Sequence, residues 1–310
     1  MTVPSDTLST PVSATRVRRV RRLSTEAVVG YLFILPAVVG FLIFYLYPSV
    51  RGLMISFTDW NLLSDPESVG LANYRELLAD EKFWDALGIT FKYVLWNIPL
   101  QTVLAILMAV AMDRVVKSMF VKGLLILPYL LSNVLVALTF LWLLDPLLGV
   151  VNAGLEALGI ARQPFFGAPE QAIETIAGIN VWRHTGFNAL LFYAGLQAIP
   201  RTVFEAARID GASAVQEFFR ITLPLLRPVT VFVLVTSLIG SFQIFDTVAV
   251  TTQGGPVDST RVLVFYIYQN AFAFFKMGYA TAMSMALFVL LVVFTLIQMR
   301  LFNANHSDLE

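Results

Sequence analysis

The chain alternates long apolar runs with shorter polar segments. A helix needs about 20 mostly apolar residues to cross the hydrocarbon core of a bilayer. Six runs reach that length, and none of them contains a cluster of charges: 27–50, 89–112, 121–144, 175–198, 228–251 and 279–301. This pattern predicts an all-α fold, a polytopic transmembrane helical bundle with six spans.

Polar residues and prolines modify this pattern. The first half of the fourth run carries four polar side chains: Asn180, Arg183, His184 and Asn188. Such groups can face other protein or a cavity inside a bundle, so we still interpret the run as a span. Three runs contain a proline that predicts a kink: Pro36, Pro99 and Pro128.

Composition agrees with a membrane protein and excludes several classes of function. The chain is 57% hydrophobic and 14% charged, whereas soluble globular proteins carry about a quarter charged residues. Its 21 basic and 21 acidic residues cancel, so bulk charge gives no reason to expect binding to nucleic acid. Without cysteine there is no disulfide or thiolate metal site. Since the second histidine, His306, lies in the tail, we predict no metal site at His184.

The distribution of charge predicts the domain organisation and the orientation. We expect a cytoplasmic tail over 1–26, a membrane domain over 27–302 and a second cytoplasmic tail over 303–310. Five arginines lie between residues 16 and 22, and with them 13 of the 21 basic residues fall in segments on one side of the spans. The positive-inside rule then puts both termini in the cytoplasm, with 52–88 and 253–278 outside. The first apolar run is too long for a signal peptide, so we interpret it as an uncleaved span.

The segment 199–228, between the fourth and fifth runs, has the signals of a folded loop. Thr202 with Glu205 predicts a capping box at the start of a helix, and Ser213 with Gln216 predicts a second one. Gly211, between them, can adopt the left-handed conformation that ends the first helix. The loop should therefore be a helix, a glycine turn and a second short helix that ends near Pro224.

The same loop resembles the EAA loop of the integral membrane subunits of binding-protein-dependent ABC importers. The matching residues are Glu205, Ala206, Ala207, Gly211, Ile221, Leu223 and Pro224. Further stretches are similar to the carbohydrate-uptake branch, which includes permeases for maltose, lactose and glycerol phosphate: residues 35–48, 57–61, 70–74 and 242–256. The resemblance covers nearly the whole chain and implies the type I permease fold of that family.

This resemblance implies a mechanism and a set of partners. The chain would carry a sugar or sugar-derived solute across a prokaryotic cytoplasmic membrane, with a second homologous permease, two ATPase subunits and an extracytoplasmic binding protein. ATP and Mg would be used by the ATPases, because this chain has no P-loop sequence and binds no cofactor of its own. The loop would be the coupling helix that docks on an ATPase, through Glu205, Ala206, Ala207, Arg208, Asp210 and Gly211.

A sugar path should combine hydrogen-bonding groups with aromatic faces inside the bundle. The candidates are Asn133, Asn188, Tyr193, Gln197, Ser237, Gln243 and Asp246, with Asn180 and Ser241 as further members. Asp246 has two interpretations. An intramembrane carboxylate is a candidate functional group, but it could instead be structural, bonded to backbone or to Arg183 or Arg261.

Three alternatives stay open on the sequence. An ABC importer permease for a non-sugar solute would share the loop. A secondary transporter would need an ion-binding carboxylate and usually inverted repeats, and only Asp246 fits the first condition. A membrane-embedded enzyme would need a cluster of catalytic His, Asp or Glu at membrane depth, and the sequence contains none.

Overall fold

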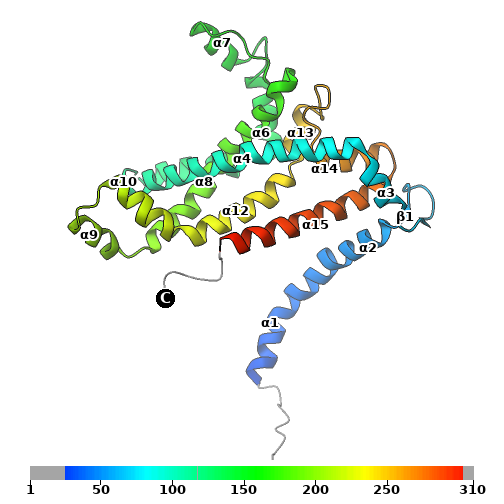
Figure 1. Ribbon diagram of the computed structural model, residues 1–310, viewed down its shortest axis with the longest axis horizontal. Helices are drawn as coiled ribbons and strands as arrows, with labels where there is room; N and C mark the ends of the chain where they lie inside the picture. Colours follow the sequence, from blue (N-terminus) through cyan, green and yellow to red (C-terminus); the bar gives the residue numbers. More distant parts are fainter. Residues whose placement is uncertain (1–24, 117, 303–310) are drawn as a thin grey trace, which may run out of the picture. The chain divides into compact units, whose positions relative to one another are not determined.

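The computed structural model describes residues 25–116 and 118–302. The arginines of the N-terminal tail, Lys117 and the tail over 303–310 therefore lie outside the described residues. The chain divides into two compact units, the first ending at Arg51 and the second beginning at Gly52. Helices account for nearly all of the regular secondary structure among the described residues (Figure 1), which confirms the all-α prediction.

The first unit is a continuous apolar helical segment. It consists of α1 (Thr25–Phe41), a π-helical turn (Leu42–Leu46) and α2 (Tyr47–Ile55), whose last residues belong to the second unit. Every side chain from Val29 to Val50 is exposed except Gly40, which is partly buried. A helix that is apolar all round requires lipid or a protein partner around it.

Among the described residues, fewer helices are long and apolar enough to span a membrane than the six predicted. Four stretches qualify: Val29–Ile55, Glu81–Arg114, Arg227–Thr251 and Met277–Leu301. A fifth is a bent pair, α5 (Met119–Leu130) with α6 (Asn133–Leu143), whose axes differ by 91°. The predicted fourth span corresponds to α8 (Pro169–Ala198), which is long enough at 30 residues but does not qualify as a span. Its polar residues, which we list above, are the physical reason.

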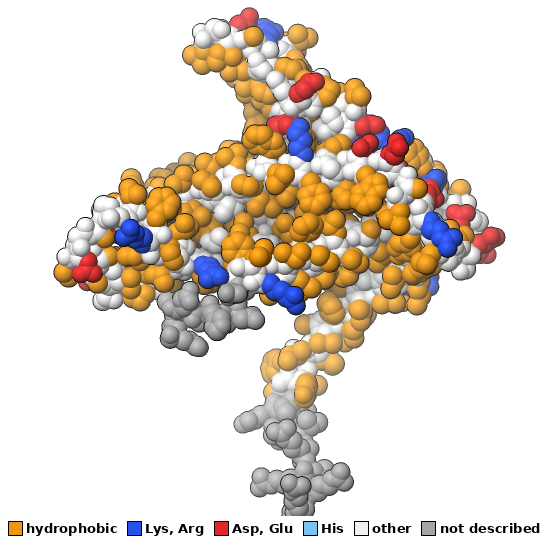
Figure 2. Space-filling model, in the orientation of Figure 1, with side chains coloured by type: hydrophobic (Ala, Val, Ile, Leu, Met, Phe, Trp, Pro, Cys, Tyr) orange, Lys and Arg blue, Asp and Glu red, His pale blue; other side chains and the backbone are white. Residues whose placement is uncertain are grey.

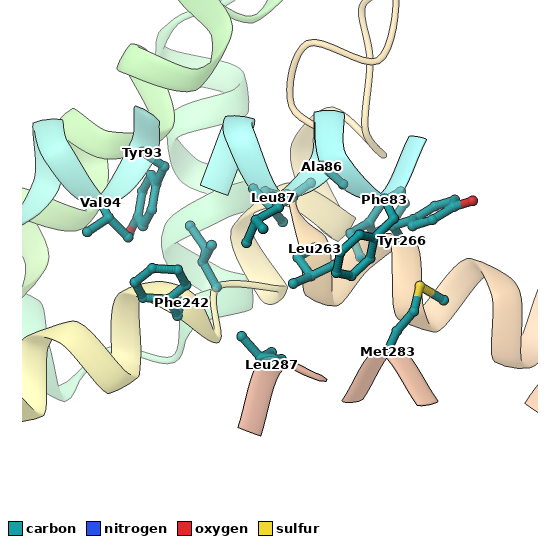
Figure 3. Packing of buried hydrophobic residues seen from close by; sticks show 14 of the residues in the cluster. Phe83, Ala86, Leu87, Tyr93, Val94, Phe242, Leu263, Tyr266, Met283 and Leu287 are labelled. Atoms are coloured by element: carbon teal, nitrogen blue, oxygen red, sulfur yellow. The ribbon is translucent and has the colours of Figure 1, made fainter. Parts of the chain in front are cut away.

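The core of the second unit forms where α4 (Glu81–Arg114) and α8 pack along each other and meet α12 (Arg227–Phe242) and α15 (Met277–Leu301). Figure 3 shows side chains of α4 facing those of α12, α14 and α15. Their apolar spacing in α4 follows one helix face, as in Phe83, Leu87 and Val94. A second cluster joins α4, α8 and α12 further along, around Phe192 and Leu226.

Close backbone contact also holds α8 against the bent pair. A Cβ on Gly186 would lie 1.9 Å from the carbonyl oxygen of Leu125, a distance that no side chain can tolerate. Only glycine therefore permits α5 and α8 to approach this closely.

The end of the second unit that contains α3 (Ala72–Ala79) is built from short elements. The strands β1 (Thr58–Asp59) and β2 (Glu67–Ser68) pair antiparallel. Asp80 caps α4 by accepting from the Lys82 N–H at 3.0 Å, and it also accepts from the hydroxyls of Tyr266 and Tyr279 at 2.7 Å each. Burial would raise the pKa of Asp80, but these hydrogen bonds outweigh it and lower that pKa.

The segment predicted as a simple outer loop, 253–278, is more structured than expected. It contains α14 (Leu263–Tyr268) and a π-helical turn (Gln269–Ala273). Leu263, Phe265 and Tyr266 are buried in the core beside α4 and α15. The other predicted loop, 52–88, is shorter than expected because α4 already begins at Glu81.

The connection between α6 and α8 folds on itself. It carries α7 (Val150–Ala157) and a 3-10 turn (Phe165–Gly167), and α7 projects away from the long helices in Figure 1. Asn152 fixes the connection by donating to the Gln163 carbonyl at 2.9 Å and accepting from the Gln163 N–H at 2.8 Å.

The outside of the second unit is strongly apolar. Figure 2 shows hydrophobic side chains covering the length of the helices, with the charged side chains mostly toward their ends. On α15 this surface consists of Phe288, Val289, Val292, Val293, Leu296 and Ile297, all exposed. Apolar helix faces of this size are typical of lipid or subunit contact.

Candidate functional site

A polar cavity of about 350 Å³ lies between the long helices of the second unit. Its walls come from α4, α8 and α12 and from the two places where helices break, between α5 and α6 and between α12 and α13 (Asp246–Thr251). The lining residues are Tyr93, Asn97, Gln101, Tyr129, Asn133, Asn180, His184, Phe187, Asn188, Thr236, Ser237, Gly240, Ser241, Gln243, Ile244, Phe245, Asp246 and Thr247.

Two amides of α4 form one wall with hydroxyls of α12. Asn97 donates to the Ser241 hydroxyl at 2.9 Å, and Gln101 donates to the Ser237 hydroxyl at 3.1 Å. The Asn97 side-chain oxygen is buried without a hydrogen-bond partner. An unpaired buried acceptor costs free energy, so the described neighbours of Asn97 satisfy its amide only in part.

The two helix breaks meet at a single hydrogen bond. Asn133 is the first residue of α6 and Asp246 is the first residue of α13. The Asn133 side chain donates to Asp246 Oδ2 at 2.8 Å. This bond joins both short helices at the cavity.

Arg183 stabilises the break between α5 and α6. The break leaves carbonyl groups without helical partners, and Arg183 donates to two of them, Tyr129 O at 3.2 Å and Leu131 O at 3.0 Å. Tyr129 also stacks on Phe187 with ring centroids 4.2 Å apart. Arg183 lies near the middle of α8, and the break that it holds brings Tyr129 to the cavity wall.

The expected ion pairs of Asp246 do not form. Arg183 is bonded to carbonyls and to His184, and Arg261 pairs with Asp258. Asp246 instead accepts from Asn133, so the structural alternative with an arginine partner is wrong for these two arginines.

The structure brings together five of the seven predicted path residues. Asn133, Asn188, Ser237, Gln243 and Asp246 all line the cavity, as do Asn180 and Ser241.

Two predicted path residues lie elsewhere. Tyr193 accepts a hydrogen bond from the Lys122 ammonium at 2.6 Å, and Gln197 donates to Asp113 at 2.6 Å. Tyr193 and Gln197 face other parts of the bundle because each lies one or more turns beyond Asn188 on α8.

Sequence reasoning missed eleven lining residues: Tyr93, Asn97, Gln101, Tyr129, His184, Phe187, Thr236, Gly240, Ile244, Phe245 and Thr247. One signal was present for two of them. Asn97 and Gln101 are amides four residues apart in an apolar run, and this spacing places both on one helix face. The aromatic residues carried no such signal, since aromatic side chains are common in any span.

The loop between α8 and α12 has the helix, turn and helix that the sequence predicts. The first helix is α9 (Arg201–Ile209), and Gly211 follows it with φ of +78°, which confirms the left-handed glycine. The Ser213–Gln216 capping box at α10 (Ala214–Glu217) is also confirmed. A π-helical turn (Phe218–Thr222) and α11 (Leu223–Leu225) continue it toward Pro224.

The predicted capping box of Thr202 with Glu205 is wrong. The helix α9 begins at Arg201, two residues earlier than this box requires, with Pro200 at its N-cap position and no side chain that caps it. Proline favours this start because its fixed φ suits a helix terminus. Thr202 and Glu205 are both exposed instead.

The two alanines of α9 differ in exposure, so they do not form one exposed face together. Ala207 is 9% exposed and lies on the same side of α9 as Val203 and Phe204, which pack against the second core cluster. Ala206 is exposed, as is Ile209 at 85%. The free face of α9 therefore contains Thr202, Glu205, Ala206 and Ile209, spaced as one side of a helix.

Ion pairs connect α9 with α10 and α4. Glu217, whose side chain is 5% exposed, pairs with Arg114 at 2.5 Å and with Arg208 at 3.3 Å. A second cavity of about 380 Å³ lies beside this group, lined by charged side chains of α4, α9 and α10 and by uncharged residues of α8. Since α4 also supplies Asn97 and Gln101, one helix contacts both cavities.

Residues 82–304 match the family described as the binding-protein-dependent transport system inner membrane component. The chain belongs to this family. The match includes the polar cavity and the α9 loop, so both lie inside the part of the chain that the family shares. It does not include the first unit.

Individual relatives extend the similarity to most of the chain. The probable ABC transporter permease protein YesP of Bacillus subtilis is 37% identical over 290 residues, covering 92% of this chain and 93% of that protein. The trehalose/maltose transport system permease protein MalF of Thermococcus litoralis is 32% identical, covering 89% and 94%. Among solved structures, a bacterial alginate ABC transporter in complex with an alginate pentasaccharide-bound periplasmic protein is similar with a TM-score of 0.75 and 26% identity, covering 88% and 93%.

Proposed function

We propose that this chain is the membrane-spanning permease subunit of an ATP-driven importer for a sugar or sugar-derived solute. The observation that carries the proposal is the cavity near the middle of α4 and α8, where amides, hydroxyls and aromatic rings converge in a member of this permease family. These groups suit a solute with many hydroxyls, since each amide offers both a donor and an acceptor. The similarity to a trehalose/maltose permease supports the same solute class.

The proposed path residues are Asn97, Gln101, Asn133, Asn188, Ser237, Gln243 and Asp246. Tyr193 and Gln197 are not included, because their hydrogen bonds are made outside the cavity. Asp246 contributes by orienting Asn133 and by accepting from solute hydroxyls.

Energy would enter at α9. We assign the docking of a cytoplasmic ATPase to the free face of this helix and the turn after it, with Glu205, Ala206, Arg208, Asp210 and Gly211 at the contact and Ala207 packed behind it. Three exposed apolar side chains extend this surface: Ile209, Val215 and Phe219. The ion pairs of Glu217 would carry movement of α9 to α4, and so to the cavity wall.

The full assembly would contain a second homologous permease, two ATPase subunits and an extracytoplasmic binding protein, in a prokaryotic cytoplasmic membrane. The relative solved with a periplasmic protein supports the last of these partners. The α9 end would face the cytoplasm with both termini, and the α3 end would face outward.

Vesicle transport tests this function against its rivals. The assembled complex in proteoliposomes should take up radiolabelled oligosaccharide only with ATP on the ATPase side, and vanadate should abolish the uptake. Uptake that follows a proton or sodium gradient without ATP would instead support a secondary transporter. Uptake of amino acids or peptides but of no saccharide would support a non-sugar importer.

Cysteine labelling tests the orientation, since the chain has no cysteine of its own. We expect a membrane-impermeant thiol reagent added outside cells to label Asp65→Cys but not Ser213→Cys. The reverse pattern would contradict the proposed topology.

A further inference from the structure

The polar cavity carries charge of only one sign. Among its lining residues, all of which the structure describes, Asp246 is the one carboxylate and none is a lysine or arginine. The other polar groups are amides, hydroxyls and the His184 imidazole. His184 Nδ1 lies 2.9 Å from the Asn180 carbonyl and Nε2 lies 3.0 Å from Arg183 Nη1. This pattern fits a neutral ring that donates through Nδ1 and accepts at Nε2.

The nearby cations are engaged elsewhere. Arg183 does not line the cavity, and its Nη groups bond to the carbonyls of the helix break and to His184. Lys122 donates to Tyr193, and Arg261 pairs with Asp258. An anionic solute would therefore find no lysine or arginine among the residues that line the cavity, and the Nη donors of Arg183, which lies beside it, are already occupied.

Asp246 can accept further hydrogen bonds from a neutral solute. Its Oδ2 accepts from Asn133, and its Oδ1 has no hydrogen-bond partner among the described residues, while the side chain is only partly buried. A carboxylate accepts strong hydrogen bonds from hydroxyls. The same carboxylate repels a second negative charge, and repulsion is stronger in a cavity than in water.

We infer that this chain's share of the path selects uncharged saccharides and rejects those carrying a carboxylate, phosphate or sulfonate. The inference rests on the proposed function and names the solute class within it. Similarity alone leaves both classes open, since one relative is named for trehalose and maltose, which are neutral, and another for alginate, which is anionic. The charge of the cavity wall decides between them.

Equilibrium binding to the assembled complex without its binding protein tests this selectivity directly, because the binding protein would otherwise choose the solute first. The probes are maltotriose, cellotriose and galactotriose, each compared with its derivative oxidised to a carboxylate at one C6. We expect the neutral member of a pair to bind at least about tenfold more tightly. Asp246→Asn should reduce that ratio at least threefold, while Asp65→Asn, in an exposed segment outside the cavity, should leave it unchanged.

A second variant covers the case in which Asp246→Asn fails to assemble. Gln243 lines the cavity and is exposed within it, so Gln243→Lys should lower the ratio by adding a cation without touching the Asn133 bond. Equal or tighter binding of the acidic probes to the wild type would overturn the inference, as would an unchanged ratio in whichever variant assembles. ATP-driven import of acidic saccharides would overturn this inference alone, whereas absence of all saccharide binding and uptake would overturn the proposed function as well.

Discussion

The two cavities of the second unit differ in how they use polar side chains. The cavity between α4, α8 and α12 is lined by amides, hydroxyls and aromatic rings, with one carboxylate. The cavity at the α9 end is lined by Asp113, Arg114, Arg201, Glu205, Arg208 and Glu217 together with uncharged residues. Both cavities border α4 and α8, but the first also takes walls from α12 and the second from α9 and α10.

The depth of each cavity along the helices explains the difference. Charge is costly in the middle of a bilayer and cheap at its surface, and Asn97 is near the middle of α4 whereas Arg114 is its last residue. Uncharged amides can bind and release a solute without a large desolvation cost. Ion pairs at the helix end can instead hold α9 to α4 firmly enough to transmit movement.

The largest expected effect is a loss of stability when the buried side of α9, but not its free side, receives a charge. Ala207→Asp would bury an unpaired carboxylate against Val203 and Phe204 and should destabilise the chain by about 3 kcal/mol or more. Thermal unfolding in detergent should show a clear loss. Ala206→Asp is the matched control, because its side chain would lie in solvent on the free face. Equal loss from both substitutions would contradict the assignment of the two faces.

The ion pairs at the α9 end should matter for coupling more than for folding. Glu217→Gln keeps the size of the side chain but removes the charge shared by Arg114 and Arg208. We expect solute transported per ATP hydrolysed to fall about tenfold, a cost of about 1.4 kcal/mol, with ATPase association retained. Glu156→Gln, at an exposed ion pair with Arg162, should leave the transport ratio unchanged. If Glu217→Gln transported as much solute per ATP as the wild type, these ion pairs would have no role in coupling.

The amide wall should matter for solute and not for the ATPase. Asn97→Leu and Gln101→Leu remove hydrogen-bonding groups from the solute cavity. Each should weaken saccharide binding about tenfold, within the range for losing one or two hydrogen bonds, and this can be measured by titration of the assembled complex. Thr139→Val, on the exposed side of α6, serves as a control that should bind as wild type. If the control and the wall variants weakened binding alike, the cavity would not be the solute site.

The turn after α9 should show a smaller effect. A β-branched residue at Gly211 would have to adopt φ of +78°, so Gly211→Val should destabilise the turn by about 1–2 kcal/mol. Gly123→Ala, in a helix with open space around the new Cβ, should not. We expect lower transport at raised temperature for the first variant only, and equal temperature profiles would argue against a strained turn.

The smallest effect is a pH dependence at the α3 end, far from both cavities. The lowered pKa of Asp80 means that its hydrogen bonds stabilise the fold above its ordinary pKa of 3.8 and are lost as pH falls below it. The difference in Tm between wild type and Asp80→Asn should be constant above about pH 5 and should shrink below pH 3.8. A difference that grew toward low pH would contradict this sign.

Periodicity and turn signals predicted the regular parts of the molecule, and tertiary contacts decided the rest. The glycine turn at Gly211 and the capping box at Ser213 are local features that a sequence reveals. The capping box at Thr202 failed because Pro200 offers a competing helix start. The burial of α14 depends on packing against α4 and α15, which its own sequence does not specify.

The residues that line the cavity were predicted only in part, because the sequence shows which residues are polar but not which way they face. Polar residues inside the predicted spans were visible in the sequence, and seven of the nine candidates line the cavity. Tyr193 and Gln197 failed because helix rotation, set by packing, turned them toward Lys122 and Asp113. Arg183 was visible in the sequence as a polar residue of the fourth apolar run, but the break between α5 and α6 provides carbonyl partners that only the folded chain reveals.

The central claim is that α9 couples to an ATPase while the amide-lined cavity binds the sugar. The most direct test compares Ala206→Asp and Asn97→Leu in one preparation, measuring co-purification of the ATPase and binding of radiolabelled saccharide. We predict that Ala206→Asp loses the ATPase but keeps saccharide binding, whereas Asn97→Leu keeps the ATPase and loses about tenfold in saccharide affinity. If both variants lost the same property, or if Ala206→Asp retained the ATPase at the wild-type level, the claim would be contradicted.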